Sequence, residues 1–455
     1  MSNSLISALA LIVTLGVLIT VHEFGHFWVA RRLGVKVLRF SIGFGRPLWR
    51  RVGRDGVEYV IAVLPLGGYV KMLDEREGEV APDERQWAFN RQPVGSRIAI
   101  VLAGPAFNFL FAVLAYAFMF MVGIPGVKPL LDEPRPKSLA EAGDFRKGDL
   151  VMTVDGKATP TLGAVMLALV DRAMTGEAIE VEVLDADDRT RIRTLDTREP
   201  QEGLADPAQV FERVGLVPWQ PVLPAVIGQV MRDGAAERAG LRPGDRIVLA
   251  DGKPVVDWGQ WREVIERHPG QAFSTRIERE GVERSLELIP DAREDERGQR
   301  VGFIGAVADM PEDLARNLRV VVRYGPLDAV GAAIGRTWDI SLLTLRMLGR
   351  MLVGRASLDN LSGPLTIARF AGQAASAGLI AFVSLLALVS ISLGVLNLLP
   401  VPVLDGGHLL YYLIELIKGS PLSETVQNLG QQVGIAVLLL LMGLALFNDF
   451  SRIIG

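Results

Sequence analysis

The stretch that decides the fold stands at the start of the chain, where residues 1–26 read MSNSLISALALIVTLGVLITVHEFGH. Residues 1–21 contain no Asp, Glu, Lys or Arg, and crossing the hydrocarbon core of a bilayer takes roughly 20 apolar residues in a helix. A removable signal would begin with basic residues and end at a small-residue cleavage site, but here His22 and Glu23 follow directly. The stretch is therefore predicted to be a retained membrane span that ends in a polar motif.

Three further stretches lack charged side chains over a similar length, namely residues 98–127, 370–404 and 425–447. The chain of 455 residues is 49% hydrophobic and has a positive mean hydropathy, which favours a membrane protein. Its charged fraction of 22% is close to that of soluble proteins, so polar insertions must separate the spans. The sequence predicts a polytopic α-helical membrane protein with four transmembrane helices.

Basic residues set the orientation of the predicted spans. Arg31, Arg32, Lys36 and Arg39 follow the first span, whereas no basic residue precedes it, so its C-terminal end should face the cytoplasm. Counting crossings from there leaves residues 128–369 on the outer side. The inner ends of the first and third spans then lie at the same membrane face, although they are far apart in sequence.

The outer stretch contains an internal repeat. One copy reads AGDFRKGDLVMTVDGK from Ala142 and the other reads AGLRPGDRIVLADGK from Ala239. Each has a Gly-Asp turn, an apolar strand and an Asp-Gly turn, a pattern typical of a strand followed by a hairpin. The copies resemble PDZ domains, and such folds can bind an extended peptide end by adding a strand to a sheet edge. A repeat that serves only as a rigid spacer is the alternative.

The predicted organisation has five parts. They are residues 1–127 with two spans, 131–220 and 221–309 as inserted PDZ-like α+β domains, 310–369 as an amphipathic juxtamembrane segment, and 370–455 with two spans. The segment at 310–369 has Arg336, Arg346 and Arg350 spaced through an apolar run, which suits a helix on the bilayer surface or one packed on the PDZ-like domains.

The motif His22-Glu23-Phe24-Gly25-His26 has the HExxH spacing. In a helix its two histidines lie four residues apart on one face, so one zinc ion can bind both imidazoles. Glu23 then lies beside the metal, where it can accept a proton from the water that attacks a carbonyl group. The alternative is a chance match with histidines that cap a helix end, but ionisable groups at a membrane span are costly and usually functional.

A catalytic zinc site usually has three protein ligands, so a third must come from elsewhere. The candidate is Asp405, because orientation places it at the same membrane face as the histidines. Pro400 and Pro402 should interrupt the third helix before it, and Gly406 and Gly407 permit a tight turn after it. His408 is the rival ligand.

Some classes of function are excluded by composition. A formal net charge of -4 gives no basic surface for nucleic acid. The sequence has no cysteine, so neither disulfides nor thiol chemistry contribute.

The chain as a whole resembles the site-2 protease family of intramembrane metalloproteases. The motif at 22–26, the NxxP and LDGG elements at 397–407, the tandem PDZ-like insertion and the four spans match that family in order. The resemblance implies Zn²⁺ bound by His22, His26 and Asp405, with Glu23 as catalytic base. It also implies a membrane-associated β-hairpin region at residues 40–45 and 59–72.

An unwound substrate segment can pair with an exposed strand edge, and the resemblance implies such a role for the hairpin. Its alternative is a hairpin that only packs beneath the spans. Asn397 can hydrogen-bond the substrate backbone or stabilise the broken helix. The expected substrate-binding residues are Asn397, Pro400, Pro402, Gly67, Gly68 and Tyr69.

The sequence thus predicts an intramembrane zinc endopeptidase of the bacterial inner membrane, with its PDZ-like domains on the periplasmic side. The expected partners are the lipid bilayer, peptide ends at the PDZ-like domains, and single-span membrane proteins, which the resemblance suggests are anti-sigma factors and remnant signal peptides. Two rivals are a non-catalytic PDZ-bearing membrane adaptor and a metal carrier, which would need several ligand clusters.

Overall fold

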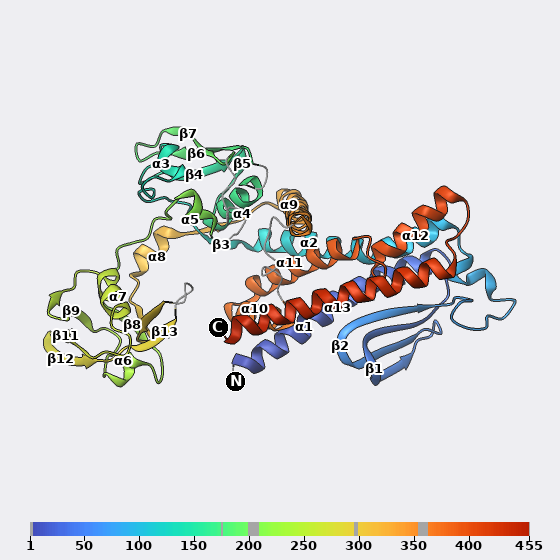
Figure 1. Cartoon of the computed structure of the whole chain (residues 1–455), viewed down its shortest axis with the longest axis horizontal. Coiled ribbons are helices and arrows are strands. Elements are labelled where there is room, and N and C mark those ends of the chain that lie inside the picture. The colour runs from blue at the N-terminus through green and yellow to red at the C-terminus, as the bar shows by residue number, and fades with distance from the viewer. Residues whose placement is uncertain (1–2, 174–175, 199–208, 295–298, 354–362, 455) are drawn as a thin grey trace. The chain divides into compact units, whose positions relative to one another are not determined.

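The computed structural model describes residues 3–173, 176–198, 209–294, 299–353 and 363–454 (Figure 1). The chain divides into two compact units, one formed by residues 1–124 with 322–455 and the other by residues 125–321. The first unit is called the membrane unit below, and the second is called the repeat unit.

Helices make up most of the membrane unit. They are α1 (Asn3–Arg32), α2 (Val94–Val122), α9 (Pro326–Leu352), α10 (Pro364–Ala377), α11 (Leu379–Asn397), α12 (Asp405–Lys418) and α13 (Glu424–Ile454). Among the described residues, four helices are long and apolar enough to cross a membrane, and they lie in α1, α2, α11 and α13. Many large apolar side chains point outward, including Leu114 and Leu440, as expected where the surrounding solvent is lipid.

Two predicted spans differ from the structure at their ends. The span predicted at 370–404 is interrupted at Gly378, whose φ of 111° ends α10, so α11 alone provides the spanning helix. The span predicted to reach residue 127 ends at Val122, because Gly123 adopts a φ of 108° and the next residues form a strand. Glycine accepts these angles without the steric penalty that other residues meet, so the apolar run alone could not reveal either break.

Helix α9 packs against α2 and α11 through a core that includes Ala333, Ile340, Ala112 and Ile391. The side chains of Leu327, Val330, Ile334 and Trp338 point away from that core and are exposed. Helix α9 therefore has one apolar side packed in that core and a second apolar side exposed. Residues 354–362 of that predicted segment lie outside the described residues.

A β-sheet follows α1 in the membrane unit. It consists of β1 (Val37–Val52) and β2 (Glu58–Met72), both of which bend, and the short 3-10 helices Arg85–Trp87 and Phe89–Arg91 come next in the chain. Residues 37–42 of β1 pair with residues 58–61 on one side and with residues 68–72 on the other. Phe27, Phe40 and Ile100 join the end of α1, the sheet and α2 in one core.

The remaining elements lie in the repeat unit, and the first and last of them each extend one residue beyond its bounds. They are β3 (Ile124–Val127), α3 (Leu139–Ala142), β4 (Leu150–Val154), β5 (Lys157–Ala158), α4 (Leu162–Ala173), β6 (Ala178–Leu184), β7 (Thr190–Asp196), α5 (Val210–Val214), β8 (Ile227–Val230), α6 (Ala235–Arg238), β9 (Arg246–Ala250), β10 (Lys253–Pro254), α7 (Trp258–Glu266), β11 (Phe273–Arg279), β12 (Val282–Leu288), β13 (Asp291–Glu294), β14 (Arg300–Phe303), β15 (Ala306–Ala308), α8 (Glu312–Leu318) and β16 (Arg319–Val322).

The two copies of the sequence repeat adopt the same strand order. The first copy forms the sheet β5-β4-β6-β7, and the second forms β10-β9-β11-β12. In each copy the Asp of the Gly-Asp turn is buried and accepts hydrogen bonds from an arginine on a later strand, Arg193 for Asp149 and Arg279 for Asp245. Each buried carboxylate thereby ties its turn to the sheet, which accounts for the recurrence of the motif.

Candidate metal centre and its cavity

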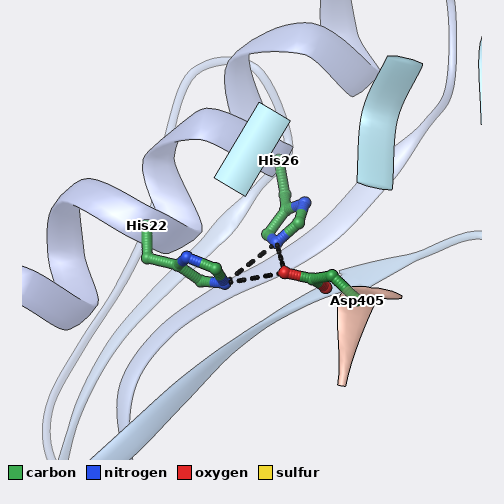
Figure 2. A group of neighbouring side chains, drawn as sticks. All are labelled: His22, His26 and Asp405. Carbon is green, nitrogen blue, oxygen red and sulfur yellow. Dashed lines mark hydrogen bonds and ion pairs between the residues drawn. The ribbon is translucent and has the colours of Figure 1, made fainter. Parts of the chain in front are cut away.

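The two histidines of the HExxH motif lie on one face of α1. The helix continues without a break from the apolar run to Arg32, so His22 and His26 are one turn apart. Their Nε2 atoms are 3.3 Å apart, and both imidazoles are buried (Figure 2). The helix therefore presents two imidazole nitrogens to one point in space.

Asp405 reaches the same point from α12, of which it is the first residue (Figure 2). Its Oδ2 lies 3.2 Å from Nε2 of His22 and 3.5 Å from Nε2 of His26. Among the described residues, these three form the one group of His, Cys, Asp and Glu side chains able to hold a metal ion. The two histidines and Asp405, far apart in sequence, therefore converge in the folded chain.

Close backbone packing positions Asp405. A Cβ on Gly407 would lie 2.5 Å from the carbonyl oxygen of Val401, so only glycine lets α12 start against residues 398–402. Val403 has a φ of 111°, which a β-branched side chain rarely adopts. Such strain tends to be found where function fixes the backbone, and here it occurs two residues before the carboxylate.

The spacing of the three donor atoms fits zinc. Zinc bonds of 2.0–2.1 Å in a tetrahedral site place neighbouring ligand atoms roughly 3.3 Å apart, which matches the observed 3.2, 3.3 and 3.5 Å. Oδ2 of Asp405 is buried and has no hydrogen-bond partner among the described atoms. A buried, unpaired carboxylate oxygen is costly, and a cation bound between the three donors would remove that cost.

Contacts at Nδ1 of each imidazole leave Nε2 available to bind a metal ion. Nδ1 of His26 donates to the carbonyl oxygen of Ile100 at 2.8 Å, which leaves the lone pair on Nε2. The side-chain amide of Asn108 lies 3.0 Å from Nδ1 of His22. Because the two ends of an amide interchange by a half-turn, this amide can accept the Nδ1 proton of His22. Ser390 donates to the backbone oxygen of Asn108 at 2.9 Å and links α11 to this site.

Asn108 and Gly104, both on α2, are site residues that the sequence analysis missed. A Cβ on Gly104 would lie 2.6 Å from Cε1 of His26 and 2.7 Å from Cε1 of His22, so glycine leaves the room for both rings. Asn108 is fully buried in an otherwise apolar span, where a side-chain amide is costly. An amide side chain in an apolar span was therefore a signal that the sequence offered. Its partner, His22, could not be identified without the packing of α1 on α2.

The electrostatics of α12 suit an anionic ligand beside a neutral histidine. Burial acts to raise the pKa of the Asp405 carboxyl, but the adjacent imidazoles of His22 and His26 outweigh it and hold the pKa well below its usual range. Burial lowers the pKa of His408. His408 lies in the wall of the same cavity but outside the group of three neighbouring donors.

A cavity of about 880 Å³ opens beside the three donors. Its walls include Glu23 and four of the expected substrate-binding residues, namely Asn397, Gly67, Gly68 and Tyr69. Pro400 and Pro402 are not among the described residues that line it. The backbone of Pro402 instead lies against Gly407 and against Gly434 of α13.

One edge of β2 borders the cavity beside Glu23, the candidate base. Residues 68–72 pair with residues 37–42 on one side, and no strand within the described ranges pairs with the other side. Gly68 packs closely on the side chain of Glu23, since a Cβ there would lie 2.9 Å from Cγ of Glu23. Nδ2 of Asn397 lies 3.4 Å from Nε2 of His22 at the same cavity.

Comparison with known proteins gives a consistent result over the full chain. The family model described as "Peptidase family M50" matches residues 10–441. The "Regulator of sigma-E protease RseP" of Escherichia coli (strain K12) is 47% identical over 450 residues, which cover 97% of this chain and 98% of the relative. "Protease RseP" of Yersinia pestis is 46% identical over 454 residues, and a "Putative zinc metalloprotease" of Vibrio cholerae is 42% identical over 459 residues, each with 100% of both chains covered.

Proposed function

Since this chain belongs to peptidase family M50, the site-2 protease family of zinc metalloproteases, we propose that His22, His26 and Asp405 bind the zinc ion of an intramembrane endopeptidase. The observation that carries the proposal is the convergence of three donor atoms from α1 and α12 at distances that suit tetrahedral zinc. The non-catalytic adaptor is not supported, because the family and the relatives are proteases. The metal carrier is not supported either, because the described residues contain one ligand cluster rather than a series.

Zinc at this site would polarise a water molecule and the scissile carbonyl group. Glu23 would accept the proton from the attacking water and return it to the leaving amide nitrogen. Its place in the cavity wall against Gly68 supports this role, because a strand paired with residues 68–72 would pass beside the carboxylate.

A transmembrane helix hides its peptide groups in internal hydrogen bonds, so it must be unwound before hydrolysis. We propose that the free edge at residues 68–72 holds the unwound segment by main-chain pairing, with Gly67, Gly68 and Tyr69 lining the path. Asn397 would hydrogen-bond the substrate backbone from the opposite element, α11. Pro400 and Pro402 would act indirectly, by holding the loop before Asp405.

The proposed substrates are single-span proteins of the bacterial inner membrane. The name of the relatives, regulators of sigma-E, supports anti-sigma factors as one substrate type, and remnant signal peptides share the same single apolar helix. The basic residues in the last turn of α1 support a cytoplasmic position for that end of the helix, which would put the repeat unit on the periplasmic side.

We assign residues 131–220 and 221–309 as PDZ-like domains that select substrates by the size or terminus of their outer part. Their shared strand order and the paired Asp-Gly turns support the assignment. In the second domain, β15 pairs with β8, and no other strand of the described chain pairs with β15. That edge suits addition of a peptide strand.

Purified protein and a model transmembrane substrate test the main proposal. Cleavage should require zinc, and Glu23→Gln should abolish it while the bound zinc content stays at the wild-type level. Cleavage by zinc-loaded Glu23→Gln would remove Glu23 from its role.

For the PDZ-like domains, replacing residues 131–309 with a short linker should allow cleavage of substrates that still carry a folded outer domain. Continued rejection of such substrates would contradict the filter.

A further inference from the structure

The position of Asp405 depends on how α12 is held. This helix does not continue α11, because the chain between Asn397 and Asp405 is not helical. The helix contacts α2, which also supplies Gly104 and Asn108 to the two imidazoles. The relation between α2 and α12 therefore sets the distance between the carboxylate and the histidines.

Arg97 of α2 and Glu415 of α12 form a bidentate ion pair. Nη2 of Arg97 donates to Oε1 of Glu415 at 2.7 Å, and Nη1 donates to Oε2 at 3.1 Å. The two side chains are 10% and 12% exposed, whereas those of the pair Arg31–Asp55 are 42% and 24% exposed. A buried pair with two parallel bonds fixes distance and orientation much more strictly than an exposed pair.

The surroundings restrict the guanidinium further. Nε of Arg97 donates to the backbone oxygen of Gln92 at 3.1 Å, just before α2 begins. Its Cζ atom lies 4.9 Å from the ring centre of Tyr412, one turn before Glu415 on α12. The ring of Phe89 meets Tyr412 edge to face. The arginine is thus attached to two points on α12 and to the chain entering α2.

The ion pair and the donor cluster lie at different levels along α2 and α12. Arg97 precedes Gly104 by seven residues, about 10 Å along α2, and Glu415 follows Asp405 by ten residues, about 15 Å along α12. The two helices run in opposite directions, because Arg97 meets Glu415 while Gly104 meets the imidazoles beside Asp405. Sliding or tilting of α12 at the ion pair would therefore move the carboxylate relative to Nε2 of both histidines.

We propose that Arg97 and Glu415 form a clamp that holds α12 on α2 and thereby positions Asp405 to bind the metal ion. The inference rests on the proposed function, since it concerns the same zinc ligands. Arg97 and Glu415 lie in the wall of the same cavity but are not among the three donors, so they are positioning residues that act through α12. Strict placement matters there, since functional sites tolerate displacements of only about 0.5 Å.

The first test is Arg97→Lys. Lysine keeps the charge, so Glu415 is not left unpaired, but it cannot form two parallel bonds or stack its flat group on Tyr412. The zinc-loaded protein is mixed with excess chelator, and release of zinc is followed in time. Zinc should leave about tenfold faster than from the wild-type protein, the lower end of the effect seen when groups supporting metal ligands are altered. The matched control is Arg279→Lys, which alters the buried bidentate pair with Asp245 in the repeat unit and should release zinc at the wild-type rate.

A second variant tests the clamp in case Arg97→Lys does not fold. Arg97→Met combined with Glu415→Leu replaces the pair by apolar side chains, so no buried charge lacks a partner. This protein should fold but still release zinc faster, and its cobalt-substituted form should have an altered visible absorption spectrum, which reports the ligand arrangement. Wild-type release and spectrum in this folded variant, or wild-type release from Arg97→Lys, would overturn the clamp alone. A wild-type protein that binds no zinc would instead overturn the proposed function itself.

Discussion

Replacing Gly104 with alanine tests the metal centre most directly, because a single methyl group would be placed against both imidazoles. The new Cβ would lie 2.6 Å from Cε1 of His26, and ordinary van der Waals contact begins at 3.4 Å. Nε2 of His26 would lie closer still, so at least 0.8 Å must be absorbed by moving the ring or separating α1 from α2. Because α1 and α2 are also in close contact at Gly25, where a Cβ would meet the backbone carbonyl of Ala103, the ring is the easier part to move.

A displacement of that size exceeds the tolerance of about 0.5 Å for a functional side chain. Zinc affinity should fall about 10- to 100-fold, and the cleavage rate should fall by about 100-fold or more. Affinity is measured in detergent by competition with a coloured chelator, and cleavage is measured with a model transmembrane substrate. Thermal unfolding of the same preparations shows whether the protein is folded.

The matched control is Gly16→Ala. Gly16 lies on α1, within a spanning helix, and a Cβ there would have no heavy atom within 4 Å. Both substitutions give the helix the same gain of about 0.5–1 kcal/mol from replacing glycine. Gly16→Ala should therefore bind zinc and cleave substrate like the wild type. Equal zinc affinity in Gly104→Ala and Gly16→Ala would refute the packing argument for the donor cluster.

Three further predictions concern the membrane unit. Asp449→Ala should lower stability by about 2 kcal/mol in thermal unfolding, because the Asp449 carboxylate accepts hydrogen bonds from the backbone at Gly363 and Leu365, at 3.0 and 2.8 Å, and at Thr366. Gly434→Ala should cost about 1–3 kcal/mol through overpacking against the Pro402 backbone, whereas Gly443→Ala, with open space, should cost nothing measurable. Chelation of zinc should lower the unfolding temperature of the wild type and leave that of metal-free His26→Ala unchanged, because a bound ligand stabilises only the folded form that binds it.

Each of these has an outcome that would contradict it. Unchanged unfolding of Asp449→Ala would mean that the start of α10 does not depend on that carboxylate. Equal stability of the Gly434 and Gly443 variants would argue against a close approach of α13 to residue 402. A chelator effect of the same size in His26→Ala would place the stabilising metal elsewhere.

The membrane class and the first two candidate ligands follow from local sequence. Charge-free runs predict spans because a bilayer has no water to solvate charges, and the described residues contain four helices long and apolar enough to cross a membrane. The HExxH spacing sets its own geometry, because a helix places residues four apart on one face. Asp405 was predicted from topology rather than from a local motif. Counting the crossings placed the ends of two distant spans at one membrane face.

Tertiary structure alone decided what surrounds those residues. The contact of Asn108 with His22, the space left by Gly104 and the ion pair between Arg97 and Glu415 join side chains up to 318 residues apart. The break at Gly378 inside the third apolar run also required the backbone, because glycine in an apolar run is compatible with a continuous or an interrupted helix. Hydrophobicity and helical period act over one or two turns of chain, whereas these contacts arise only when separate helices pack. The sequence therefore determined which groups can do the chemistry, and the packing of α2 and α12 on α1 decided how they are held.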